Sequence, residues 1–176
     1  MAKKRSSASG HPYKRPYLDS SVFIGWIKGE QIKATDTGQV VDRGKIGTHI
    51  LTQAEDGQFP IVISSLTIAE VHKKKHKPKL TDDENRNTLS YFHHGFVTVQ
   101  PIDREIGEEA NRLCRKHQDK KLLPADALHV ACAKRAGCDV LLAWDGPLTE
   151  ITEDGLRIEH PRVLGQGGLW AVESEA

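Results

Sequence analysis

The chain has 176 residues, enough for one domain with a substantial core and few for two. Hydrophobic residues make up 38% and charged residues 28%, and no apolar run approaches the roughly 20 residues that cross a bilayer, so we expect no membrane association. The basic N-terminus has no apolar segment after it, so we expect no secretory signal, and the net charge of +1 favours no class of partner.

The chain divides by composition into three parts. Residues 1–16 are polar, basic and rich in Ser, Gly and Pro, which predicts a flexible arm. Residues 17–160 carry the periodic apolar pattern of a folded domain, and the tail 161–176 is Gly-rich. The three cysteines are an odd number in apolar, helix-like surroundings, so we expect reduced thiols and a cytoplasmic protein.

Within the domain, segments typical of strands alternate with segments typical of helices. Strands are predicted where apolar runs end at turn residues or acids, at 17–19, 60–63, 96–99, 139–143 and 156–159. Helices are predicted where apolar residues recur three or four positions apart, at 20–29, 46–57, 65–71, 81–92, 103–117 and 124–137. Residues 31–44 show little pattern and are predicted to be a loop. The alternation predicts an α/β domain with a mainly parallel sheet.

Four carboxylates, hereafter the four acids, are predicted to reach one edge of that sheet. They are Asp19, Glu70, Asp126 and Asp145. Two of them follow predicted strands directly, and the other two lie early in helices, so all can reach the carboxyl edge, where ligands bind in open α/β sheets. Two carboxylates ~4 Å apart repel by roughly 4 kcal/mol at an effective dielectric near 20. Oxygen ligands without a nearby cysteine favour Mg²⁺ or Mn²⁺ as the neutralising ion.

Each of these residues also has a plainer interpretation. Asp19 and Ser21 can cap a helix, Asp126 in a first turn gains from the helix dipole, and Asp145 can begin a turn. Glu70 can be a solvated helix acid, although its neighbours are mostly apolar.

Two histidine patterns carry less weight. His129, one turn after Asp126, is interpreted as a core histidine in preference to a neighbour of the site. His72 and His76 are four residues apart, a spacing that suits zinc, but no third ligand is evident.

The sequence resembles the PIN-domain nucleases, particularly the VapC-type toxins of bacterial toxin–antitoxin pairs. The resemblance rests on four segments in order: YLDSSVFI at 17–24, SLTIAEV at 65–71, LPADALH at 123–129 and VLLAWD at 140–145. It implies a three-layer fold with a five-stranded parallel sheet, and RNA phosphodiester hydrolysis by a metal-activated water. It also implies that the four acids form the metal and catalytic site, with Ser21 as a supporting polar residue. Ala143 departs from the pattern, because the family often has Thr or Ser there.

The resemblance further implies a homodimer, an RNA substrate and an antitoxin protein as partner. A basic cluster follows Glu70, and we expect its lysines to contact an RNA backbone. These are Lys73, Lys74, Lys75 and Lys77. A PIN nuclease of RNA maturation and a non-catalytic RNA- or protein-binding module remain alternatives. A Mg²⁺-dependent phosphatase or receiver domain is a further one, although the triplet DSS at 19–21 lacks the second acid of Asp-x-Asp.

Overall fold

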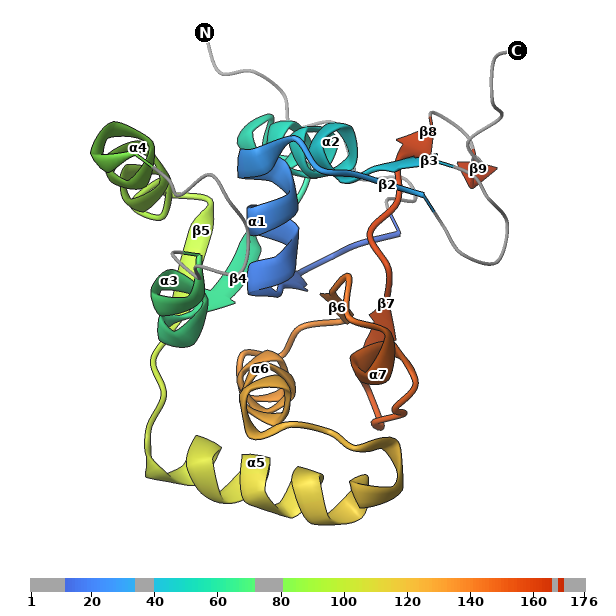
Figure 1. The fold of residues 1–176 in the computed structure, drawn as a ribbon. Coiled ribbons are helices and arrows are strands. Elements are labelled where there is room, and N and C mark those ends of the chain that lie inside the picture. The colour runs from blue at the N-terminus through green and yellow to red at the C-terminus, as the bar shows by residue number, and fades with distance from the viewer. Residues whose placement is uncertain (1–11, 34–39, 72–80, 166–167, 170–176) are drawn as a thin grey trace, which may run out of the picture.

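A parallel five-stranded sheet forms the centre of the computed structural model (Figure 1). The structure describes residues 12–33, 40–71, 81–165 and 168–169. The strand order is β5-β4-β1-β6-β7, and every neighbouring pair is parallel. The strands are β1 (Pro16–Leu18), β4 (Ile61–Ser64), β5 (Val97–Gln100), β6 (Val140–Leu142) and β7 (Arg157–Glu159). The predicted α/β fold with a mainly parallel sheet flanked by helices is therefore confirmed.

Helices separate the strands along the chain, as the alternating pattern predicted. They are α1 (Ser20–Lys28), α2 (Arg43–Glu55), α3 (Ser65–Glu70), α4 (Asp82–Tyr91), α5 (Arg104–Lys116), the 3₁₀ turn η1 (Gln118–Lys120), α6 (Pro124–Arg135) and α7 (Gly146–Thr149). Local chemistry explains several starts. Thr81 and Glu84 form a capping box before α4, and the Asp103 carboxylate accepts a hydrogen bond from the Ile106 N–H at the start of α5.

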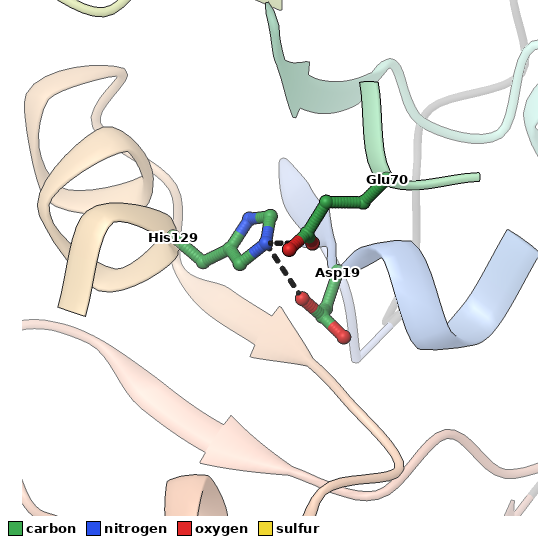
Figure 2. Close-up of side chains that lie close together, drawn as sticks. All are labelled: Asp19, Glu70 and His129. Atoms are coloured by element: carbon green, nitrogen blue, oxygen red, sulfur yellow. Dashed lines mark hydrogen bonds and ion pairs between the residues drawn. The ribbon is translucent and has the colours of Figure 1, made fainter. Parts of the chain in front are cut away.

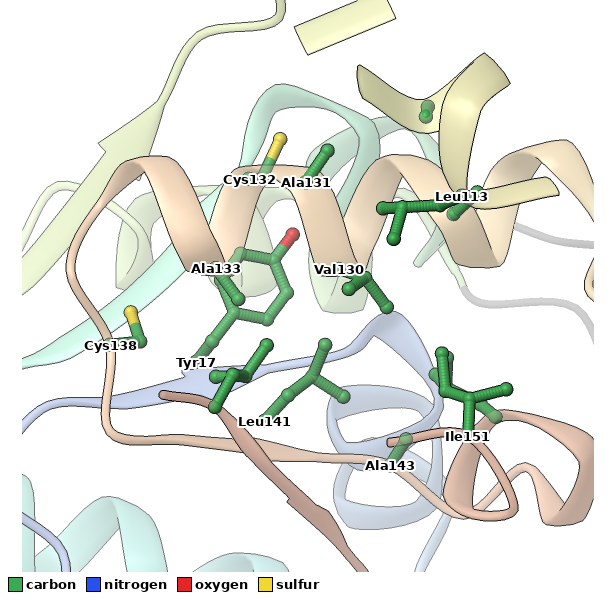
Figure 3. Close-up of a cluster of buried hydrophobic side chains, with 14 of the residues drawn as sticks. Tyr17, Leu113, Val130, Ala131, Cys132, Ala133, Cys138, Leu141, Ala143 and Ile151 are labelled. Carbon is green, nitrogen blue, oxygen red and sulfur yellow. The ribbon is translucent and has the colours of Figure 1, made fainter. Parts of the chain in front are cut away.

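The sheet divides the core into two layers, because successive strand residues point to opposite faces. Tyr17, Val62 and Leu141 pack with α5, α6 and α7 on one face, as Figure 3 shows around α6. The next residues of the same strands, Leu18, Ile63 and Leu142, pack with α1, α2 and Phe92 on the other face. Figure 1 shows α5 and α6 below the sheet and α1 and α2 above it. Burial on both faces explains the continuous apolar strand runs.

The segment predicted as a loop at 31–44 differs from that prediction. Strands β2 (Gln31–Lys33) and β3 (Val40–Asp42) pair there in an antiparallel ribbon, and α2 begins at Arg43. The side chains of β2 are all exposed, so the ribbon lacks the alternation between a buried and an exposed face that identifies a strand in a sequence.

Residues near the two ends of the described chain take part in the fold: Tyr13 and Arg15 pack against the domain, and a short strand pair forms near the C-terminal end. The side chain of Tyr13 is 1% exposed, and the backbone N–H of Arg15 donates to Asp139 Oδ1 at 2.6 Å. The part of the predicted arm that precedes β1 is therefore packed against the domain from Tyr13 onward. In the predicted tail, β8 (Leu164–Gly165) pairs antiparallel with β9 (Gly168–Leu169).

The three cysteines are free thiols, with Cys132 and Cys138 buried and Cys114 half-buried. Within the described ranges, no helix has the length and apolarity that a bilayer crossing requires.

Candidate active site

Three adjacent strands, β4, β1 and β6, end at the same edge of the sheet and lead into the segments that carry Glu70, Asp19 and Asp145. Asp126 lies in the first turn of α6, the helix that precedes β6. Asp19 follows β1 directly, and its backbone N–H donates to the Leu142 carbonyl at the end of β6, at 3.0 Å. Strand β1 has β4 on one side and β6 on the other, so the connections leave it in two directions. Ligands of open α/β sheets bind beyond the carboxyl ends of the strands at such a point.

Asp19, Glu70 and His129 converge at this edge from α1, α3 and α6 (Figure 2). The Nε2 atom of His129 lies 3.0 Å from Asp19 Oδ1 and 3.0 Å from Glu70 Oε2. One ligand atom from each of the three residues lies within 4.8 Å of the others. All three side chains are buried, so bulk water screens their charges poorly.

Neighbouring groups hold the two buried carboxylates in place. The Ser20 hydroxyl donates to Glu70 Oε2 at 2.7 Å, and the Ser21 backbone N–H donates to Asp19 Oδ2 at 2.9 Å. Asp19 is thus the N-cap of α1 and a member of the cluster at the same time. The Oδ2 atom of Asp19 caps α1, and its Oδ1 atom lies beside His129, so one carboxylate has both contacts.

Asp126 lies in the first turn of α6, behind Pro124, and is half-buried. Its pKa is raised from 3.8 to about 6 by burial first, and then by the negative charges of Asp145, Asp19 and Glu70. His129 acts in the opposite direction, but the sum is still a raised pKa. Burial is therefore the main cause of the raised pKa of Asp126, and the charges of the other three acids add to it.

Asp145 occupies the rim of this edge. It is exposed, and its Oδ1 accepts a hydrogen bond from the Leu148 N–H at 3.4 Å as the N-cap of α7. The turn predicted after Asp145 is the first turn of that short helix. The charge of Asp145 also contributes to the raised pKa of Asp126, and its place in a metal site stays a prediction.

The Ser21 hydroxyl acts on the backbone beside the site. Its Oγ accepts a hydrogen bond from the Trp144 N–H at 3.0 Å, which ties the start of α1 to the segment before Asp145. The Ser21 hydroxyl therefore contacts the main chain at Trp144, next to Ala143. Ala143 is the position at which the PIN-domain family often has Thr or Ser.

His129 is a buried, hydrogen-bonded histidine, as predicted, and it is also a neighbour of two of the four acids, as the alternative interpretation had it. Its ring is 1% exposed, but Nε2 faces Asp19 and Glu70, while Nδ1 lies 2.8 Å from the Tyr17 hydroxyl. The spacing of three residues from Asp126 was the available signal, because residues i and i+3 share a helix face. The predicted RNA-contacting lysines and His72 and His76 lie outside the described residues. The lysines are Lys73, Lys74, Lys75 and Lys77.

The donor set fits a hard divalent cation. Carboxylate oxygens are the ligands that Mg²⁺ and Mn²⁺ prefer, and the excess of negative charge on Asp145, Asp19 and Glu70 adds to burial, the largest cause, in raising the pKa of Asp126. A cation at this edge would offset that excess.

Two solved structures have a similar fold. VapC20 of Mycobacterium tuberculosis, described as a sarcin-ricin loop cleaving toxin, superposes with a TM-score of 0.54 at 14% identity, over 77% of this chain and 93% of VapC20. VapBC2 of Rickettsia felis, solved with a fragment of its promoter DNA, has a TM-score of 0.54 at 18% identity, over 83% of this chain and 98% of that one.

At these identities the two similarities establish the fold. No curated protein sequence matches the chain. The model of the PIN domain family matches residues 17–152, which span β1 to the segment after α7 and include the four acids. The chain therefore belongs to the PIN domain family.

Proposed function

We propose that this PIN domain is a Mg²⁺- or Mn²⁺-dependent endoribonuclease and the toxin of a type II toxin–antitoxin pair. The observation that carries the proposal is the convergence of ligand atoms from Asp19, Glu70 and His129 within 4.8 Å of one another, with Asp126 one turn before His129 on α6. The charges of Asp145, Asp19 and Glu70 add to burial in raising the pKa of Asp126, and a divalent cation would offset that repulsion. Family membership supports the same conclusion.

Asp19, Glu70 and Asp126 are the residues that would hold the ion, with Asp145 completing the acidic pocket at the rim. A bound divalent cation supplies a Lewis acid that activates water and offsets charge on the phosphoryl group. The chain itself orients the ligands: the Ser20 hydroxyl holds Glu70 and the Ser21 N–H holds Asp19.

Substrate and partners belong to the same proposal. We assign RNA as substrate, an antitoxin protein as partner, a homodimer as the assembly and the cytoplasm as location. The folds of VapC20, described as a sarcin-ricin loop cleaving toxin, and of VapBC2 support the toxin role over RNA maturation. The lysines at 73, 74, 75 and 77 are assigned to the RNA backbone, because a cluster of positive charge binds phosphates without sequence preference.

A cleavage assay with a matched control tests the activity. Purified full-length protein is incubated with mixed RNA and with single-stranded DNA, in Mg²⁺, in Mn²⁺ and in chelator. We expect metal-dependent cleavage of RNA, lost by roughly 100-fold or more in Asp126→Asn. Asp119→Asn is the control, because it makes the same change at an exposed position in η1 and should leave cleavage unaffected.

Three results would contradict the proposal. Full cleavage by a well-folded Asp126→Asn protein would remove Asp126 from the site, and loss of folding in that variant would make Asp126 a structural residue. Absence of divalent binding in calorimetry of the wild type would favour a non-catalytic module. For the toxin role, expression should arrest growth and the product of an adjacent gene should relieve the arrest; an active nuclease without that effect would be an RNA-maturation enzyme.

A further inference from the structure

His129 is the one nitrogen donor in the cluster that it forms with Asp19 and Glu70. We propose that His129 is itself a ligand of the divalent ion, that Tyr17 positions its imidazole, and that the site therefore prefers Mn²⁺ to Mg²⁺. This inference rests on the proposed function, because it adds a ligand to the same site.

The distances at Nε2 match those of a coordination shell. Octahedral sites for small divalent ions have metal–ligand distances of about 2.0–2.1 Å, which places adjacent ligand atoms about 3 Å apart. The Nε2 atom lies 3.0 Å from one oxygen of Asp19 and 3.0 Å from one of Glu70. In Figure 2 the ring of His129 points from α6 toward the two carboxylates, with Nε2 foremost.

The second ring nitrogen of His129, Nδ1, has the Tyr17 hydroxyl as its hydrogen-bond partner, and this hydroxyl can serve either tautomer of the ring. A tyrosine hydroxyl can donate to a bare Nδ1 or accept from a protonated one, and the Tyr17 hydroxyl lies 2.8 Å from Nδ1. When Nε2–H donates to the carboxylates, Tyr17 donates to Nδ1; when the Nε2 lone pair faces an ion, Nδ1–H donates to Tyr17. Metal-binding histidines almost always have such a partner for their second nitrogen.

An imidazole ligand changes which ion the site binds. Mg²⁺ favours oxygen ligands and keeps several of its waters, whereas imidazole suits ions of the first transition row, among which Mn²⁺ tolerates oxygen ligands as well. Two carboxylates and one imidazole, all buried, form a mixed oxygen and nitrogen site. Such a site should discriminate in favour of Mn²⁺ more strongly than oxygen ligands alone would.

Pulsed electron paramagnetic resonance of the Mn²⁺-loaded, tag-free full-length protein tests the ligand directly. We expect modulation from a directly bound ¹⁴N nucleus in the wild type and its loss in His129→Gln. His93→Gln, the same change at an exposed histidine after α4, should keep the signal. Calorimetry should show Mn²⁺ affinity reduced roughly tenfold or more in His129→Gln, with Mg²⁺ affinity changed less. Tyr17→Phe should keep the nitrogen signal and lower the Mn²⁺ affinity less.

The outcomes separate this inference from the proposed function. Bound Mn²⁺ without a nitrogen signal in the wild type would overturn the role of His129 while the nuclease proposal stands, and this result does not depend on any variant folding. A nitrogen signal that persists in a folded His129→Gln protein would also overturn it. A wild type that binds no divalent ion would overturn the nuclease proposal together with this one.

Discussion

The two ends of helix α6 meet buried carboxylates in opposite electrostatic settings. Toward the N-terminal end, His129 contacts Asp19 and Glu70, and the charges of these two acids act on Asp126. At the C-terminal end, Lys134 contacts Glu153, whose side chain is only 2% exposed. Both settings bury negative charge beside the same helix, so the difference between them lies in what balances that charge.

Glu153 is neutralised by the chain itself. The Lys116 and Lys134 ammonium groups and the His117 ring each lie 2.7 Å from one of its oxygens. Burial alone would raise the pKa of Glu153, but these hydrogen bonds and charges outweigh burial and lower the pKa to about 2. Asp126 shows the reverse, with a pKa raised to about 6. Glu153 is balanced by cations of its own chain, whereas the pKa of Asp126 is raised by burial and by neighbouring acids, the setting in which we propose a cation.

The largest expected effect is on RNA cleavage, which should depend on Glu70 at the proposed metal site and not on Glu153. Glu70→Gln should lower RNA cleavage by roughly 100-fold or more, because it removes a charged ligand from the proposed site. Glu153→Gln should leave cleavage per folded molecule within about threefold, since it lies outside that site. Initial rates normalised to the folded fraction measure both, and equal losses in the two variants would end the distinction.

The next effect is stabilisation by the ion. At a free concentration 100 times the dissociation constant, Mn²⁺ should raise the free energy of unfolding by about 2.7 kcal/mol, because it binds the folded state. Denaturant unfolding with and without the ion measures this gain. Asp126→Asn should reduce it at the same ion concentration, whereas Glu153→Gln should keep it; an equal gain in both variants would place the ion elsewhere.

Removal of the Glu153 charge should cost stability. Glu153→Gln should lower the free energy of unfolding at pH 7 by about 2 kcal/mol, discounted because Lys116 and Lys134 are partly exposed. The folded pKa of Glu153 is lowered from 4.5 to about 2, so the contribution is present above pH 4.5 and is lost as the pH falls toward 2. Urea titrations across that range test it, and a loss that does not depend on pH would contradict the ion-pair explanation.

The smallest effect has the opposite sign. In metal-free protein at pH 7, Asp126→Asn should raise the free energy of unfolding by about 1 kcal/mol, discounted for the partial exposure of Asp126. The folded pKa of Asp126 is raised from 3.8 to about 6, so ionisation costs stability increasingly as the pH rises through that interval. The gain should therefore be full above pH 6 and vanish below about pH 4. A destabilised variant at pH 7 would indicate that the helix-dipole role dominates.

Much of the fold could be predicted because its signals are local. The five strands appear as short apolar runs, and Thr81 and Asp103 begin helices through hydrogen bonds to residues three positions away. The ribbon β2–β3 could not be predicted in this way, since its exposed residues carry no alternating pattern. Packing of Tyr13 against Phe59 depends on residues far apart in the chain, which no local window contains.

The sequence by itself predicted that the four acids reach one edge of the sheet, because a parallel sheet gathers the carboxyl ends of its strands there; Glu70 does so from the last residue of the short helix α3. Only the tertiary structure decided what else lies among them. The role of His129 depends on which buried groups face its two nitrogens, and those groups come from β1, α3 and the start of α1. A buried histidine looks the same in a sequence whether it faces apolar side chains or carboxylates, since its neighbours are set by packing.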